Sequence, residues 1–120
     1  MFQFLLVFIG GGLGSLSRYG IGLAIQPLVP KFPWATLVAN GLACIVLGSL
    51  VGLEINGNLS DSRRLLLTTG FCGGFSTFST FTAETWYYLQ NGQYNTAAVN
   101  IIGNLLLCFI CLVLGMRLTN

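Results

Sequence analysis

The sequence predicts an all-α membrane protein with four transmembrane helices, from its composition and from the spacing of its polar segments. Of its 120 residues, 54% are hydrophobic and 7% are charged, and the mean hydropathy is +0.80. A soluble domain normally carries about 25% charged residues, so five basic and three acidic side chains cannot form a water-exposed surface. One crossing takes about 20 apolar residues, which leaves room for four crossings and for no soluble domain.

Polar and turn-forming residues divide the chain into four apolar segments. The loops between them hold the prolines around Lys31, half of the charges between Glu54 and Arg64, and the turn Asn91-Gly92. The first segment lacks the basic start and the cleavage site of a signal peptide, so we expect it to remain as a helix. The chain is thus predicted to be a single transmembrane domain of residues 1–120, with helices at about 2–25, 34–53, 65–89 and 96–118.

The distribution of positive charge gives little preference for one orientation. With four crossings, both termini lie on the side of the middle loop, which carries Arg63, Arg64 and Arg117. The other side carries Lys31, with Arg18 near the same end of the first helix. Because this bias is weak under the positive-inside rule, the chain could insert in both orientations.

Small residues indicate tight packing of the helices. Glycines four residues apart, Gly10 with Gly14 and Gly48 with Gly52, favour close approach of helix backbones in lipid. A second copy of the chain could share this packing. The four cysteines also lie in apolar segments, and we interpret them as small packing residues, because the chain has no histidine to complete a zinc site.

The sequence TTGFCGGFSTFSTFTAET, residues 68–85, is unusual for membrane depth. Gly73 and Gly74 each cost about 1 kcal/mol relative to alanine in a helix interior. The hydroxyls that follow can compete with the helix hydrogen bonds. Because irregular backbone is tolerated in a membrane only where protein buries it or where it lines a cavity, these residues predict an interruption beside a cavity. The alternative is a continuous helix whose hydroxyls bond back to preceding carbonyls.

Aromatic rings and amides around this segment favour an anion. Phe75, Phe78 and Phe81 recur at a spacing of three, and the edges of their rings carry partial positive charge. Two polar pairs on other helices, Thr36 with Asn40 and Asn100 with Asn104, each share a helix face, and asparagine N–H groups can replace water around an anion. The alternatives are aromatic packing and hydrogen bonds between helices.

Two charged residues lie inside the predicted helices near this region. Arg18 can either extend to the interface or pair with a carbonyl or carboxylate. Glu84 follows Phe81 by three residues and lies beside the aromatic residues that begin at Trp86. A solvated helix end is the simpler interpretation of Glu84.

Four stretches of sequence resemble the Fluc/CrcB family of fluoride channels along nearly the whole chain. They are GGGLGSLSRY around Arg18, TLVANGLAC around Asn40, TTGFCGGFSTFSTFTAE in the third segment and GNLLLC in the fourth. The third is long and unusual in composition, so it is a specific match.

The resemblance implies an antiparallel, dual-topology homodimer with two fluoride pores and with a third helix broken in mid-membrane. It implies a structural Na⁺ ion at the dimer interface, held by the backbone carbonyls of Gly73 and Ser76. It matches Arg18 to the arginine of the family's first helix, and we assign structural roles to Arg18 and Glu84. The fourth helix matches least well; Asn100 is the aligned candidate there, and Asn104 is a weaker one that could face a neighbouring helix. The residues implied for the pore are Asn40, Phe78, Phe81, Ser79, Thr80, Thr36 and Asn100.

The function implied by this resemblance is passive export of fluoride across the cell (inner) membrane, which protects the cytoplasm from fluoride that enters as HF. The implied partners are fluoride, sodium, the lipid bilayer and a second copy of the chain, with no nucleic acid. A small-multidrug-resistance-type antiporter has a similar length but needs a carboxylate in its first helix, where this chain has none. A membrane assembly subunit without transport would not need an interrupted helix. An enzyme is not expected, because the chain has no paired carboxylates or nucleophile–base arrangement.

Overall fold

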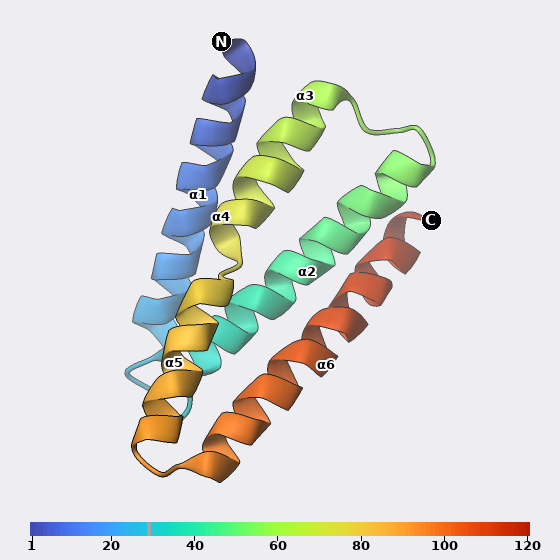
Figure 1. The fold of residues 1–120 in the computed structure, drawn as a ribbon. Helices are drawn as coiled ribbons and strands as arrows, with labels where there is room; N and C mark the ends of the chain where they lie inside the picture. The colour runs from blue at the N-terminus through green and yellow to red at the C-terminus, as the bar shows by residue number, and fades with distance from the viewer. Residues whose placement is uncertain (29) are drawn as a thin grey trace.

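The chain folds into helices, as the sequence predicted. The computed structural model describes residues 1–28 and 30–120, and no strand occurs among them. Figure 1 shows the order of the elements along the chain. They are α1 (Phe2–Ile25), α2 (Trp34–Ile55), α3 (Asp61–Arg63), the π-helix η1 (Arg64–Cys72), α4 (Gly73–Phe75), α5 (Phe78–Gln90) and α6 (Tyr94–Thr119).

The arrangement of these helices is that of a multi-pass membrane protein. Helices α1, α2 and α6 are each long and apolar enough to cross a membrane. The segments α3, η1 and α4 follow one another without a gap, and α5 continues the path after two residues. Both termini and the α2–α3 loop lie at one end of the molecule, and the α1–α2 and α5–α6 connections lie at the opposite end (Figure 1).

Close backbone contacts hold the helices in two pairs, α1 with η1 and α4, and α2 with α6. A Cβ atom on Gly14 would meet the carbonyl oxygen of Phe71, and one on Gly48 would meet the carbonyl oxygen of Leu112. The paired glycines of the sequence therefore bring helices of the same chain together. Helices α2 and α6 run in the same direction, because Asn40 lies opposite Asn104 and Gly48 opposite Leu112.

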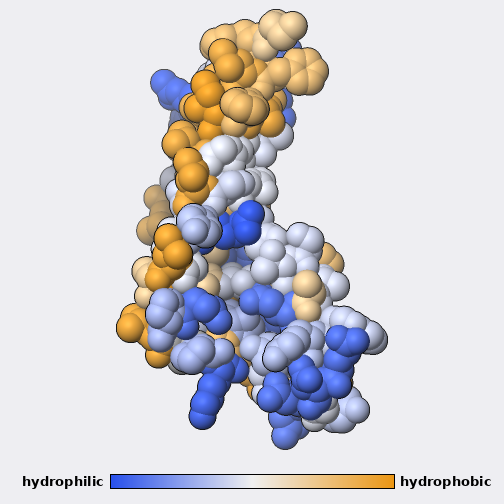
Figure 2. Space-filling model, turned by 90° about the vertical axis from the view of Figure 1, so that its left-hand side faces the viewer, coloured by the Kyte–Doolittle hydropathy of each residue, from blue (hydrophilic) through white to orange (hydrophobic). Residues whose placement is uncertain are grey.

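The small core lies where α2 meets α4. Ala39, Ala43 and Phe75 form a buried cluster against which Ile21 and Phe71 pack. Much of the remaining apolar surface is exposed on the single chain. Figure 2 shows hydrophobic residues over the upper part of one face and hydrophilic residues gathered at its lower end. This distribution suits a molecule surrounded by lipid or by another apolar surface.

The backbone leaves helical geometry at Ser76 and Thr77, which have φ/ψ of −82°/154° and −149°/111°. Gly73 remains helical, with φ −62° and ψ −36°, so the glycine pair is not itself the irregular point. A Cβ on Gly74 would meet the carbonyl oxygen of Gly11. Gly74 is thus explained by the close approach of α1, and the extended residues follow two positions later.

Candidate functional site

A chain of buried and partly buried hydrogen bonds joins the α4–α5 junction to α2 and α6. The Thr77 backbone N–H donates to Asn40 Oδ1 at 2.8 Å, and Asn40 Nδ2 donates to Asn104 Oδ1 at 3.2 Å. Asn104 Nδ2 donates to Asn100 Oδ1 at 2.9 Å, and Asn100 Nδ2 donates to Thr85 Oγ1 at 2.9 Å. Each amide therefore gives a hydrogen to the next group, which fixes the orientation of all three asparagines.

These asparagines are buried, although they lie in apolar helices. Their exposed fractions are 8% for Asn40, 5% for Asn104 and 1% for Asn100. Because burying an amide is costly unless it is hydrogen-bonded, the chain of bonds explains how the fold tolerates them. The sequence left open whether the amides bond between helices or face a cavity, and Asn40 and Asn104 do both, since they also line a pocket.

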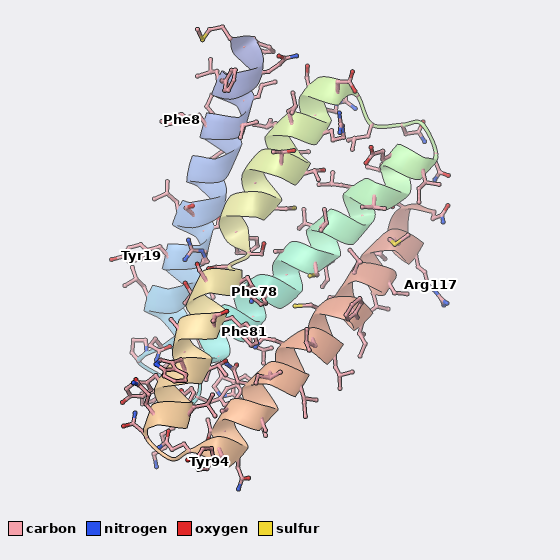
Figure 3. The ribbon with its side chains drawn as sticks, viewed as in Figure 1. Phe8, Tyr19, Phe78, Phe81, Tyr94 and Arg117 are labelled. Atoms are coloured by element: carbon pink, nitrogen blue, oxygen red, sulfur yellow. The ribbon has the colours of Figure 1, made fainter. Side chains whose placement is uncertain are left out.

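That pocket, which we call the amide pocket, has a volume of about 330 Å³. Figure 3 shows Phe78 and Phe81 on the side of α5 that faces α2 and α6. The two rings are 5.5 Å apart between centroids and tilted by 49°. None of the described residues that line the pocket is charged. They are Asn40, Cys44, Ser76, Thr77, Phe78, Phe81, Asn104, Leu105, Cys108, Phe109 and Leu112.

The three phenylalanines that recur at a spacing of three, Phe75, Phe78 and Phe81, have different surroundings. Phe75 is 5% exposed and belongs to the core, with its ring 5.3 Å from that of Phe71. Phe81 is 8% exposed, whereas Phe78 is 75% exposed on the single chain. The interruption after Phe75 separates the first ring from the other two, so the spacing of three does not produce one continuous aromatic face.

Hydroxyl groups gather at the start of α5. Thr77 Oγ1 accepts from the Thr80 backbone N–H at 3.2 Å, and it caps the helix. The same hydroxyl lies 3.1 Å from Thr80 Oγ1 and 3.2 Å from Ser79 Oγ. Thr77 satisfies only the third N–H of α5, so those of Phe78 and Ser79 have no intrahelical acceptor. This helix start can accept an anion.

A second pocket shares Thr77 with the amide pocket. Arg18, Thr36, Thr77 and Thr80 are among the residues that line it. Arg18 Nε donates to the carbonyl oxygen of Gly74 at 3.2 Å, which is the carbonyl pairing that the sequence left as one alternative. Arg18 thus supplies a donor to a carbonyl near the end of α4, where the helix no longer supplies one.

Glu84 lies in a third pocket with Ser79 and Thr80. Its Oε1 atom is buried and has no hydrogen-bond partner among the described residues. The Thr36 hydroxyl lies beside the carboxyl group. Glu84 is therefore partly enclosed by α2 and is not a freely solvated helix end.

The carbonyls of Gly73 and Ser76 lie where the helix hydrogen bonds stop. The Thr77 N–H, which would bond to the Gly73 carbonyl in a continuous helix, donates to Asn40 instead. The Thr80 N–H, which would reach the Ser76 carbonyl, donates to Thr77 Oγ1. No group of three or more His, Cys, Asp or Glu side chains suited to a metal occurs in residues 1–28 and 30–120. Carbonyl oxygen is the ligand type that this region offers to a hard cation.

The structure adds three residues that sequence reasoning undervalued or missed. Asn104 was the weaker candidate of the fourth helix, yet it joins Asn40 to Asn100. Thr77 contributes a backbone N–H as well as its hydroxyl. Cys108 lines the amide pocket, and its position four residues after Asn104 on the same helix face is a signal that the sequence contained.

Comparison with known proteins identifies relatives along the whole chain. Residues 5–116 match the family described as "CrcB-like protein, Camphor Resistance (CrcB)". A protein of Pyrococcus abyssi named "Fluoride-specific ion channel FluC" is 46% identical over 97% of this chain and 94% of its own length. Proteins of the same name from Thermus thermophilus and Phocaeicola vulgatus are 43% and 39% identical, over 98% and 100% of this chain and 95% and 100% of their own lengths. The chain belongs to the CrcB family.

Proposed function

We propose that the chain is a subunit of a channel that conducts fluoride passively out of the cell. The observation that carries this proposal is the amide pocket, which combines amide, hydroxyl and aromatic groups without a charged side chain. Relatives that share up to 46% of their residues with this chain are named fluoride-specific ion channels. The pocket chemistry supports the same kind of substrate, a small and strongly hydrated anion.

An anion that enters a narrow apolar passage must exchange water for other hydrogen-bond donors. Asn40 uses one hydrogen of its Nδ2 group for Asn104 and retains a second, and α5 begins with N–H groups that have no intrahelical acceptor. The rings of Phe78 and Phe81 offer partial positive charge at their edges. None of these groups binds as tightly as a fixed cation, so the anion can be partly dehydrated and still released.

The conduction path that we propose continues from the amide pocket to the second and third pockets. Thr77 lines the amide pocket and the second pocket, and Thr80 lines the second and third pockets. Thr36 and Ser79 extend the polar lining on this side. Asn100 supports the path through Asn104 and does not line it, because Asn100 bonds to Asn104 and is almost fully buried.

A second, antiparallel copy of the chain would close these pockets and complete two pores. Phe78 is 75% exposed on the single chain, although it lines a pocket with buried asparagines. An aromatic residue at the rim of a pocket that holds buried amides fits an interface better than it fits lipid. The weak charge bias between the two ends is compatible with copies in both orientations.

The carbonyls of Gly73 and Ser76 fit a structural sodium ion shared by the two copies. Each chain would contribute two oxygens, and a cage of carbonyls suits a hard monovalent cation without a carboxylate. A Cβ on Gly73 would meet nothing within 4 Å in its own chain. Gly73→Val should therefore spare the fold of one chain but weaken the dimer, whereas Gly12→Val, also without neighbours within 4 Å, should not. Size-exclusion chromatography in detergent with sodium or potassium would distinguish these results.

Fluoride efflux from liposomes tests the proposed function. Purified protein should release fluoride from preloaded liposomes and retain chloride under the same conditions, and the fluoride flux should not depend on a sodium gradient. Release of chloride at the rate of fluoride would contradict selectivity. Absence of fluoride release from liposomes that contain folded protein would contradict the proposed function.

A further inference from the structure

We propose that Cys44 and Cys108 form a dithiol that captures a trivalent arsenical, and that the captured group closes the conduction path. Both cysteines line the amide pocket. The occlusion rests on the proposed function, whereas capture by the two thiols does not. We define this pair as the pocket dithiol.

The register of α2 and α6 brings the two cysteines together. Asn40 lies opposite Asn104 at 3.2 Å, and Gly48 lies opposite Leu112 in backbone contact. In both pairs, the residue on α6 follows the residue on α2 by the same number of positions in the sequence. Cys44 and Cys108 are separated by this same number, and they lie midway between the two pairs. Because α2 and α6 run in the same direction, a contact one turn before and another one turn after holds the two thiols face to face. In agreement, Cys44 and Cys108 line the same pocket as Asn40 and Asn104.

The other cysteines differ in exposure and position. Cys72 and Cys111 are buried, whereas Cys44 and Cys108 are partly exposed. Neither Cys72 nor Cys111 lines the amide pocket. A reagent that enters the pocket therefore meets the pocket dithiol and not the other two thiols.

A monosubstituted trivalent arsenical suits two adjacent thiols, because the third bond of its arsenic is already made to carbon. With phenylarsine oxide, the two S–H bonds break, two As–S bonds form, and the oxygen leaves as water with the two protons. No atom changes its oxidation state, so no oxidant or reductant is needed. The phenylarsenic group would remain beside Asn40 and Phe78, in the space that the proposed path requires.

The capture is tested by mass spectrometry of the purified full-length protein after treatment with phenylarsine oxide. We expect one phenylarsenic adduct per chain, the loss of two titratable thiols, and reversal by a dithiol such as dimercaptopropanol. The Cys72→Ser/Cys111→Ser variant, which keeps the pair, should behave in the same way. Cys44→Ser and Cys108→Ser should each lose the stable adduct. In the wild type, proteolysis should yield one arsenic-linked species that contains Cys44 and Cys108.

Specific results would overturn the assignment. The pocket dithiol is excluded if the wild type forms no adduct, or if the adduct persists in Cys44→Ser or links other cysteines. Fluoride efflux, measured for each variant against its own untreated sample, should fall to that of protein-free liposomes only where the adduct forms. An adduct with unchanged efflux would show that the captured group lies outside the path. If the untreated protein releases no fluoride, the proposed function fails, and the adduct measurement still decides the capture.

Discussion

At the scale of single residues, Asn40 has two functions that depend on one orientation of its amide. Its oxygen accepts the Thr77 N–H and holds the α4–α5 junction against α2. Its nitrogen donates to Asn104, and the residue lines the amide pocket. The carboxylate of aspartate can still accept the Thr77 N–H, but it cannot donate to Asn104 and it places a negative charge beside the amide pocket.

Asn40→Asp should abolish fluoride flux while the protein still folds. Two like charges about 4 Å apart repel by about 4 kcal/mol at an effective dielectric constant near 20, which corresponds to a roughly 1,000-fold lower rate if it all adds to the barrier. Asn95→Asp, which adds the same charge at an exposed position, should retain flux. Efflux from liposomes measures both variants. Near-normal flux in folded Asn40→Asp would remove Asn40 from the path.

Phe78→Ile should reduce fluoride flux and spare stability, whereas Phe75→Ile should reduce stability and spare flux. Phe78 is 75% exposed, so its replacement should change stability little but should reduce fluoride flux strongly by removing the ring edge. Phe75 belongs to the core with Ala39 and Ala43, so its replacement should cost about 1–3 kcal/mol of stability and leave the flux per folded molecule nearly unchanged. Thermal unfolding in detergent and efflux separate the two. Equal flux in both variants would indicate that the rings serve only packing.

At the scale of the helices, the elements could be predicted from local sequence more readily than their irregularities. Apolar stretches bounded by polar residues indicated the helices, and α1 spans Phe2–Ile25 where residues 2–25 were expected. The extended residues Ser76 and Thr77 could not be located from local sequence. Their position depends on Asn40, which binds the Thr77 N–H, and on Arg18, which binds the Gly74 carbonyl from α1. Both partners lie far away in the sequence.

The same limit applied to the candidate site. Hydroxyl and amide residues with regular spacing were visible in the sequence, but which of them meet depends on the register between α2 and α6. Asn104 shows this most clearly, because its position opposite Asn40 follows from the backbone contact of Gly48 with Leu112 about two turns further along. Helical spacing places Asn100 and Asn104 on one face of α6 but does not say which helix that face meets.

Gly14→Ala should destabilise the pairing of α1 with η1 and α4, whereas Gly12→Ala should not. A Cβ on Gly14 would meet the carbonyl oxygen of Phe71 and the backbone nitrogen of Phe75, and one on Gly12 would meet nothing within 4 Å. Overpacking of this kind typically costs about 1–3 kcal/mol, while alanine at an open helical position is favourable by up to about 1 kcal/mol. Thermal unfolding in detergent compares the variants. Equal melting temperatures would contradict the close approach of α1 and η1.

At the scale of the whole molecule, the two ends of the chain are similar enough in charge for the proposed assembly to use both orientations. Arg63 ends α3, Arg64 begins η1 and Arg117 lies in the last turn of α6, all in elements at the end with the termini, whereas Lys31 lies between α1 and α2. Arg64 lies 3.8 Å from Asp61, which partly offsets the positive charge of its end. The weak charge bias and the open pockets, which the proposed second copy would close, are both compatible with that assembly.

A single cysteine in the α5–α6 turn should be accessible from both sides of the membrane. Gln93 is a better position than Gly92, because Gly92 has φ +72° and a side chain there would be strained. In a variant without the four native cysteines, an impermeant maleimide should label about half of the Gln93→Cys copies from each side, because the charge bias is too weak to select one orientation. Asn58→Cys, in the loop at the opposite end, should also be labelled about equally from both sides. Lysines added around Gln93 should shift both labels in opposite directions and lower the flux, since fewer antiparallel pairs would form. Labelling of either position from one side only would contradict the antiparallel dimer, and the pockets would then need a different partner to close them.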